Sequence, residues 1–329
     1  PLIRWLQQRN IRPMHVLLVR HGQSENNILE AAHGSGEAFY GKRSIDPPLS
    51  KLGHQQAELL GRRLGAQLKG SKHRLRLLCS SMKRAMQTVQ PLASALQLPV
   101  TVHPDVHEVQ GFFGAPDARG LERIQIQEQF PGFDAALVPE NGQGSETCAE
   151  AYARAKRVVQ LLRTWPQNAE EEIVVIVSHC DFIGLLGRLL LVFGSGPAGV
   201  GPGDQINSSA EHFAEEMFCD SYWSMNNTGI SHFILGARPP QGAYPVDSYL
   251  LYWNRSDHLA EHQRSGIQFK NIGFSQAAEW ARVGRGGSDL DPKFHEHKVI
   301  HIPWQASLVG ASAAVALCAL MVMFGRKHG

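Results

Sequence analysis

Short apolar runs alternate along the chain with longer segments in which apolar side chains recur every three or four positions. Residues 15–19, 75–78 and 173–177 form continuous or nearly continuous apolar runs. Runs of this length are typical of strands that are buried on both faces of a parallel sheet. Further strands are expected at residues 231–235 and 248–253.

The segments between these runs have the spacing of amphipathic helices. Ser50 can cap a helix that carries Leu52, Leu59, Leu60 and Leu64. Further helices are expected over residues 82–96, 146–162 and 182–193. Alternating strands and helices predict an α/β protein, here a three-layer α/β/α sandwich with a mostly parallel central sheet.

Each of the three apolar runs ends in polar residues of the same chemical kind. Arg20, His21 and Gly22 follow the first run, Cys79 to Arg84 follow the second, and Ser178 and His179 follow the third. The carboxyl ends of neighbouring parallel strands meet at one edge of the sheet, so we expect a single electropositive pocket there. Arginine guanidinium groups bind phosphate oxygens in a bidentate manner and stay charged at any working pH. The sequence therefore predicts a phosphate-binding pocket that contains histidine.

The order of these motifs along the chain resembles the histidine phosphatase superfamily, which includes cofactor-dependent phosphoglycerate mutases and many phosphatases. The landmarks span roughly residues 14 to 262. They are Arg20, His21, Gly22, Ser24 and Asn27; Asp46, Pro48, Leu49, Ser50 and Gly53; Ser80, Ser81 and Arg84; Glu108; Gly144, Glu146 and Arg154; and His179 and Asn227.

The resemblance implies a role for individual residues. His21 would be the nucleophile that becomes phosphorylated, Arg20, Arg84 and His179 would bind the transferred phosphoryl group, and Asn27 would add a hydrogen bond. Glu108 would be the general acid and base. Catalysis would then rest on His21, Glu108 and His179, with no metal ion and no organic cofactor. To attack, His21 must be unprotonated, whereas His179 is expected to be protonated.

The sequence departs from the family pattern at two places. Cys180 follows His179, where relatives commonly have glycine. The glycines after Glu108 are Gly111 and Gly114, whereas relatives often place one four residues on. Asp105 is therefore the alternative candidate for the acid.

Composition is consistent with one large catalytic domain that carries appendages. The chain has 329 residues, of which 43% are hydrophobic and 19% are charged. The net charge of +2, without a basic stripe, argues against a nucleic-acid partner. The cysteines are odd in number and form no CxxC pair, which favours a reducing compartment over a disulfide framework.

The end of the chain predicts a membrane anchor. Residues 307–324 are uncharged and precede Arg326 and Lys327, and a helix of this length spans about 27 Å of a bilayer core of about 30 Å. The expected organisation is an N-terminal extension (1–13), a catalytic domain (14–262), a linker (263–305), a transmembrane helix (306–324) and a basic tail (325–329). The catalytic domain would face the cytosol, with the mitochondrial outer membrane and the endoplasmic reticulum both open as locations.

Two further patterns carry no function in this interpretation. Residues 194–199 match a GxGxxG pattern, but they follow a helix and contain proline, so they are interpreted as a lid or an insertion. His295, His297 and His301 are interpreted as linker residues and not as a metal site.

Together these features predict a membrane-anchored phosphatase that hydrolyses phosphate monoesters through a phosphohistidine at His21. The expected partner is a phosphorylated substrate, which is a small molecule, a lipid-associated ester or a phosphoprotein. Two alternatives stay open. One is a phosphoglycerate mutase-type phosphotransferase, and the other is a non-catalytic, tail-anchored scaffold that binds phosphorylated partners.

Overall fold

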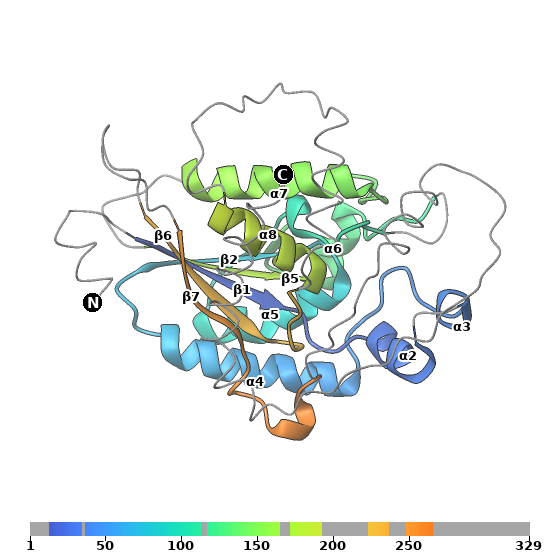
Figure 1. Cartoon of the computed structure of the whole chain (residues 1–329), viewed down its shortest axis with the longest axis horizontal. Helices are drawn as coiled ribbons and strands as arrows, with labels where there is room; N and C mark the ends of the chain where they lie inside the picture. The colour runs from blue at the N-terminus through green and yellow to red at the C-terminus, as the bar shows by residue number, and fades with distance from the viewer. Residues whose placement is uncertain are drawn as a thin grey trace, which may run out of the picture.

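A central sheet flanked by helices on both faces forms the body of the molecule (Figure 1). The computed structural model describes residues 13–34, 37–112, 117–164, 172–192, 223–236 and 248–265. Within these ranges the sheet has seven strands in the order β4-β3-β2-β5-β1-β6-β7. The strands are β1 (Met14–Arg20), β2 (Arg74–Cys79), β3 (Val100–Val102), β4 (Phe133–Asp134), β5 (Glu172–Ser178), β6 (Ile230–Leu235) and β7 (Ser248–Arg255).

The predicted mostly parallel sheet is confirmed. Strands β1 to β5 pair in parallel with one another, whereas β6 runs antiparallel to both β1 and β7. The three predicted apolar runs are the adjacent strands β2, β5 and β1. In the register Arg20 lies opposite Ser178, and Cys79 lies opposite Val177. The polar residues that follow all three strands therefore start from one edge of the sheet.

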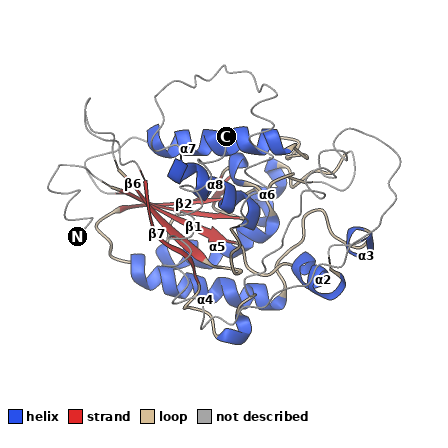
Figure 2. Ribbon diagram, viewed as in Figure 1, coloured by secondary structure: helices blue, strands red, loops and turns tan. Residues whose placement is uncertain are grey.

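Helices cover the two faces of the sheet, as Figure 2 shows. On one face lie α7 (Cys148–Thr164) and α8 (Cys180–Val192), and on the other lie α4 (Lys51–Leu68) and α5 (Lys83–Leu96). Because successive strand residues point to opposite faces, Val16 and Leu18 pack with α7 and α8, and Leu17 and Val19 pack with α4 and α5. The shorter helices are α2 (Glu25–His33), α3 (Glu37–Tyr40) and α6 (Arg123–Gln129).

The local sequence explains where the long helices begin. Ser50 caps α4 as predicted, since its Oγ accepts a hydrogen bond of 3.0 Å from the Gly53 N–H. Helix α7 starts at Cys148, two residues later than predicted, because the Thr147 Oγ1 accepts from the Glu150 N–H at 3.2 Å. Helix α8 starts directly after His179, two residues earlier than predicted.

Several predictions fall on residues that the structure does not describe. No helix within the described ranges has both the length and the apolar character needed to cross a membrane. The predicted transmembrane segment at 306–324, the GxGxxG match at 194–199 and the histidines at 295, 297 and 301 all lie outside those ranges.

Candidate active site

His21 lies buried just beyond the end of β1, with only 4% of its surface exposed. Its backbone N–H donates a hydrogen bond to the Ser178 carbonyl of β5 at 2.9 Å. Its Nδ1 lies 2.6 Å from the Gly22 carbonyl oxygen. Because a carbonyl oxygen can only accept, Nδ1 must carry the proton, which leaves the lone pair on Nε2. The local backbone thus presents Nε2 as the nucleophilic atom.

Arg84, in the first turn of α5, contacts that nucleophilic atom directly. Its Nε donates to the Nε2 of His21 at 3.2 Å. Thr88 ties the two residues together, since its Oγ1 accepts from the Gly22 N–H at 2.9 Å and donates to the Arg84 carbonyl at 2.6 Å. One turn of α5 therefore fixes both the loop after His21 and the guanidinium beside it.

His179 comes from the end of β5 and faces His21. It is fully buried, and the centroids of the two imidazole rings are 5.0 Å apart. Its Nε2 lies 2.8 Å from the Oγ of Ser80, which follows β2. Among the described residues its Nδ1 has no hydrogen-bond partner. The ends of β1, β2 and β5 thus bring His21, Ser80 and His179 together, as expected.

Arg20 and Asn27, which precede and follow His21 along the chain, are the other two residues predicted to bind phosphate. Arg20 donates from Nη1 to the Met225 carbonyl. Asn27 lies in the first turn of α2, where its Oδ1 accepts from the Ser24 N–H at 3.0 Å, so its Nδ2 is the group of this side chain that can donate to a ligand. Asn227, a landmark without an assigned role in the sequence, donates from Nδ2 to the His21 carbonyl at 3.1 Å.

Glu108 has the environment of a carboxyl group that exchanges protons near neutral pH. Its Oε1 accepts from the backbone N–H groups of Val109 at 2.9 Å and Phe182 at 3.0 Å. Burial, followed by the negative charge of Asp181, raises its pKa to about 7, although both hydrogen bonds and the charge of Arg84 act against that shift. A carboxyl group with this pKa can serve as an acid and then as a base.

Asp105, the alternative acid, is engaged elsewhere. Its carboxylate forms a bidentate pair with Arg157, with distances of 2.7 Å from Nη2 and 3.1 Å from Nε. Both side chains line a shallow surface hollow together with His103, Gln160 and Thr164. The structure therefore favours Glu108 over Asp105.

The surroundings of His179 disfavour its protonated form. Burial, followed by the charges of Arg84 and His21, lowers its pKa well below the ordinary value of 6.5. The pKa of His21 is lowered well below that value too, by burial and then by Arg84 and Arg20. Both rings are therefore neutral near neutral pH, and the positive charge of the pocket belongs to Arg20 and Arg84. A bound phosphate dianion would favour protonation of the adjacent histidine.

Cys180, the departure from the family pattern, is a buried residue at the start of α8. Burial raises the pKa of its thiol, which disfavours the reactive thiolate. This is the environment of a small buried side chain.

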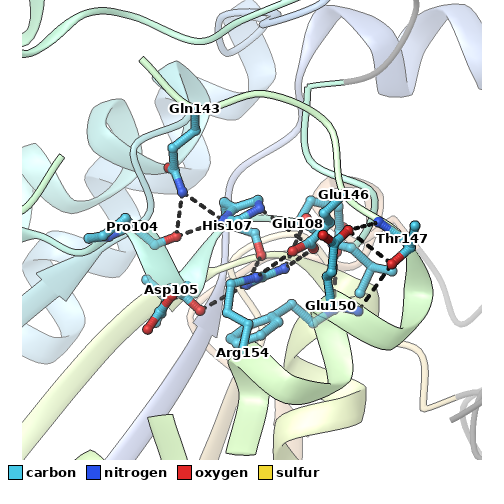
Figure 3. A network of polar contacts seen from close by, with 12 residues as sticks. Pro104, Asp105, His107, Glu108, Gln143, Glu146, Thr147, Glu150 and Arg154 are labelled. Carbon is cyan, nitrogen blue, oxygen red and sulfur yellow. Dashed lines mark hydrogen bonds and ion pairs between the residues drawn. The ribbon is translucent and has the colours of Figure 1, made fainter. Parts of the chain in front are cut away.

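Residues behind Glu108 form a polar network to which the sequence assigned no role (Figure 3). Arg154 of α7 pairs with Glu146 and donates to backbone carbonyls of the Glu108 loop. Within the described ranges, no group of three or more His, Cys, Asp or Glu side chains could hold a metal ion.

The sequence of this chain is similar to those of known proteins. A family model described as "Histidine phosphatase superfamily (branch 1)" matches residues 16–198. The adenosylcobalamin/alpha-ribazole phosphatase of Escherichia coli (strain K12) is 28% identical over 179 residues, which cover 53% of this chain and 77% of that protein. A probable phosphoglycerate mutase of Yersinia enterocolitica is 26% identical over 184 residues, which cover 54% of this chain and 75% of that protein.

A third relative extends over more of the chain. The fructose-2,6-bisphosphatase TIGAR B of Danio rerio is 25% identical over 276 residues, which cover 75% of this chain and 97% of that protein. The family model covers more than half of the chain and includes Arg20, His21, Arg84, Glu108 and His179. This chain belongs to the histidine phosphatase superfamily.

Proposed function

We propose that this protein is a phosphatase that hydrolyses phosphate monoesters through a phosphohistidine at His21. The observation that carries the proposal is the geometry of His21, whose Nδ1 donates to Gly22 while its Nε2 meets Arg84. A neutral imidazole with a fixed tautomer is a nucleophile, and the adjacent guanidinium is a phosphate ligand. The family membership and the phosphatases among the relatives support the same chemistry.

In the first half-reaction the phosphate group of the substrate draws Arg84 away from Nε2, and Arg20 and Arg84 hold its oxygens. The Nε2 of His21 attacks phosphorus while the bond from phosphorus to the leaving oxygen breaks. Glu108 gives its proton to that oxygen, so an alcohol departs and Glu108 becomes a carboxylate. Catalysis here depends on positioning and charge neutralisation, which the two arginines and Asn27 supply.

In the second half-reaction Glu108 acts as the base. Its carboxylate takes a proton from water as the water oxygen attacks phosphorus, and the bond between phosphorus and Nε2 breaks. Inorganic phosphate leaves, His21 returns to its neutral form and Glu108 is protonated again. Each step uses a side chain of this chain, so the proposal invokes neither a metal ion nor an organic cofactor.

The substrate is proposed to be a phosphorylated small molecule, a lipid-associated phosphate ester or a phosphoprotein. We further propose that residues 306–324 anchor the enzyme in a membrane with the catalytic domain facing the cytosol. The support for this anchor is the uncharged stretch at 307–324 with its basic end. Alkaline carbonate should fail to extract the full chain from membranes, whereas a variant that lacks 306–329 should be released. Fractionation would assign the membrane to mitochondria or to the endoplasmic reticulum.

The first experiment measures hydrolysis of p-nitrophenyl phosphate by the full chain in a mild detergent with EDTA present. We expect turnover that His21→Ala abolishes. A rapid quench should trap a phosphoenzyme that is labile in acid and stable in base, as a phosphohistidine is. Loss of turnover with EDTA, or turnover that persists in His21→Ala, would contradict the proposal.

A mutase is the second candidate, because one of the relatives is a probable phosphoglycerate mutase. A mutase must return the phosphoryl group to the substrate before water reaches it. Addition of 2,3-bisphosphoglycerate should then prime interconversion of phosphoglycerates faster than it yields free phosphate. A folded protein with neither activity that still binds phosphorylated ligands would instead be a scaffold.

A further inference from the structure

Arg154 makes an unusual set of contacts for a helix side chain. It lies in α7 with only 2% of its surface exposed. Its Nη1 donates to the carbonyl oxygens of Asp105 at 2.8 Å and His107 at 2.9 Å, and its Nη2 donates to that of Glu108 at 3.3 Å. One guanidinium thus binds three carbonyls of the loop that ends at the proposed acid, as Figure 3 shows.

Glu146 orients this guanidinium. Its Oε2 accepts from the Nε of Arg154 at 2.9 Å, and its Oε1 accepts from Nη2. Only 10% of the Glu146 side chain is exposed, and the Nε2 of His107 lies 3.5 Å from the same carboxylate. A bidentate pair of this kind fixes the plane of the guanidinium. The remaining N–H groups are then directed at the loop.

Arg154 also contacts the second element that holds Glu108. Its guanidinium carbon lies 4.4 Å from the ring centroid of Phe182. The backbone N–H of Phe182 donates to the Glu108 Oε1 at 3.0 Å. Arg154 therefore touches both the loop that carries the carboxyl group and the helical turn that binds it.

We propose that Arg154, held in orientation by Glu146, is a positioning residue that aims the Glu108 carboxyl group at the leaving oxygen. This inference rests on the proposed phosphatase function. A small displacement of an acid from its proton acceptor costs catalysis even when the group is still present. Lysine cannot replace the arginine, because a single ammonium group lacks the planar set of donors that reaches three carbonyls and a carboxylate together.

The test compares substrates that differ in their need for an acid. An alkyl phosphate such as β-glycerophosphate releases a poor leaving group that must be protonated, whereas 2,4-dinitrophenyl phosphate releases a stable anion. In the full chain, Arg154→Lys should lower kcat/KM for the alkyl ester by at least about tenfold, since general acid catalysis is typically worth a hundredfold or more. The kcat/KM for the dinitrophenyl ester should change by less than about twofold, because its leaving group does not need the acid. Independent effects add to within about this factor.

Arg157→Lys is the matched control. Arg157 lies one turn further along α7, but it pairs with the Asp105 carboxylate and has 57% of its side chain exposed. This variant should preserve the ratio of the two kcat/KM values. A merely structural role of Arg154 would lower activity on both esters in proportion to the folded fraction, which circular dichroism measures.

A double-mutant cycle identifies the residue through which Arg154 acts. In Glu108→Gln, where no acid is left to position, adding Arg154→Lys should lower kcat/KM for the alkyl ester by less than about twofold.

If Arg154→Lys does not fold, Glu146→Gln takes its place, because the carboxamide keeps the shape of the carboxylate while removing its charge. It should show the same selective loss on the alkyl ester.

Equal losses on both esters, or full additivity with Glu108→Gln, would overturn the inference. Failure of the phosphatase proposal itself looks different, because the unaltered chain would then hydrolyse neither ester, or His21→Ala would still hydrolyse both.

Discussion

The Nε of Arg84 donates a hydrogen bond of 3.2 Å to the Nε2 of His21, so this proposed phosphate-binding arginine occupies the lone pair of the proposed nucleophile. Before attack can occur, the phosphate group of the substrate must therefore replace the Nε2 of His21 as the hydrogen-bond partner of the Arg84 guanidinium. The same contact suppresses protonation of His21, because Arg84 follows burial as a cause of its lowered pKa.

Replacement of Arg84 tests this double role. Arg84→Ala should lower kcat/KM by about a hundredfold or more, as loss of a charge-stabilising donor typically does. It should also raise the pKa of His21, since a positive neighbour is removed. Steady-state kinetics and an NMR titration of the imidazole measure the two effects. Arg62→Ala, at an exposed position of α4, is the control. A His21 pKa that stays unchanged in Arg84→Ala would contradict this account.

The pKa of Glu108 predicts the alkaline limb of the pH profile. The acid must carry its proton in the first half-reaction, so kcat/KM for an alkyl phosphate should fall as pH rises through about 7. The acidic limb of the same profile, which follows protonation of the His21 ring, should lie well below pH 6.5. Glu108→Gln should lower the rate by about a hundredfold and remove the alkaline limb. A limb that persists in this variant would belong to another group.

Asp181 offers an independent test of the same assignment. Its negative charge, after burial, helps to raise the pKa of Glu108. Asp181→Asn removes the charge while keeping a side chain of the same shape, so the alkaline limb should move to lower pH. A pH–rate profile of the variant on the alkyl ester measures the shift. Movement to higher pH, or none, would mean that Asp181 does not act on the catalytic carboxyl group.

The strand pattern predicted the sheet well because buried strands in parallel sheets appear in the sequence as apolar runs. Strands β1 and β5 are buried over most or all of their length, and β2 is buried in its second half. Strands β3 and β4 contain only three and two residues, which is too short for a pattern to appear. Helix α2 has no buried residue, so no apolar stripe marks it in the sequence.

Part of the site could also be predicted from the sequence. His21, Arg84 and His179 lie at the ends of strands or the start of a helix, and the order of the strands in the sheet determines which of these side chains meet. Arg154 binds backbone carbonyls, which every residue type provides, so nothing in the loop sequence indicated its contacts. The preference for Glu108 over Asp105 depended on Arg157, an arginine more than fifty positions away from Asp105. Protonation of His179 depended on burial, which the sequence did not reveal.

Close backbone packing under His21 predicts sensitivity at Gly53. A Cβ at Gly53 would lie 2.0 Å from the Gln23 carbonyl oxygen, and one at Gly22 would lie 2.7 Å from the Gly53 oxygen. Gly53→Ala must therefore push α4 away from the loop after His21. Overpacking of this kind costs about 1–3 kcal/mol, so both Tm and kcat/KM should fall.

The control is Gly144→Ala, because its added methyl group would meet nothing closer than 3.6 Å. A Gly53→Ala variant with the kinetics and Tm of the unaltered protein would show that the loop and α4 can separate without disturbing His21.

A pair of histidines on the neighbouring strands β1 and β6 predicts how stability depends on pH. The Nδ1 of His15 on β1 and the Nε2 of His232 on β6 lie 2.9 Å apart, and the rings of His73 and Tyr252 pack against the pair. Burial, followed by the charge of His15, lowers the pKa of His232 from 6.5 to about 4. In the unfolded chain this ring takes up a proton below its ordinary pKa, whereas the folded protein resists protonation until about 4. The unfolded state therefore binds more protons in this window, and stability falls as pH drops through it.

His232→Gln should reduce this loss of stability. The measurement is the change in urea midpoint between about pH 7 and about pH 5, where most carboxyl groups in the unfolded chain stay ionised. Any effect of the substitution that does not depend on pH cancels in that difference. His54→Gln, at an exposed position of α4, should leave the change as it is in the unaltered protein. If His232→Gln lost as much stability between these pH values as the unaltered protein, the pH dependence would belong to other groups. His258 would be the next residue to replace, because burial lowers its pKa to about 4 as well.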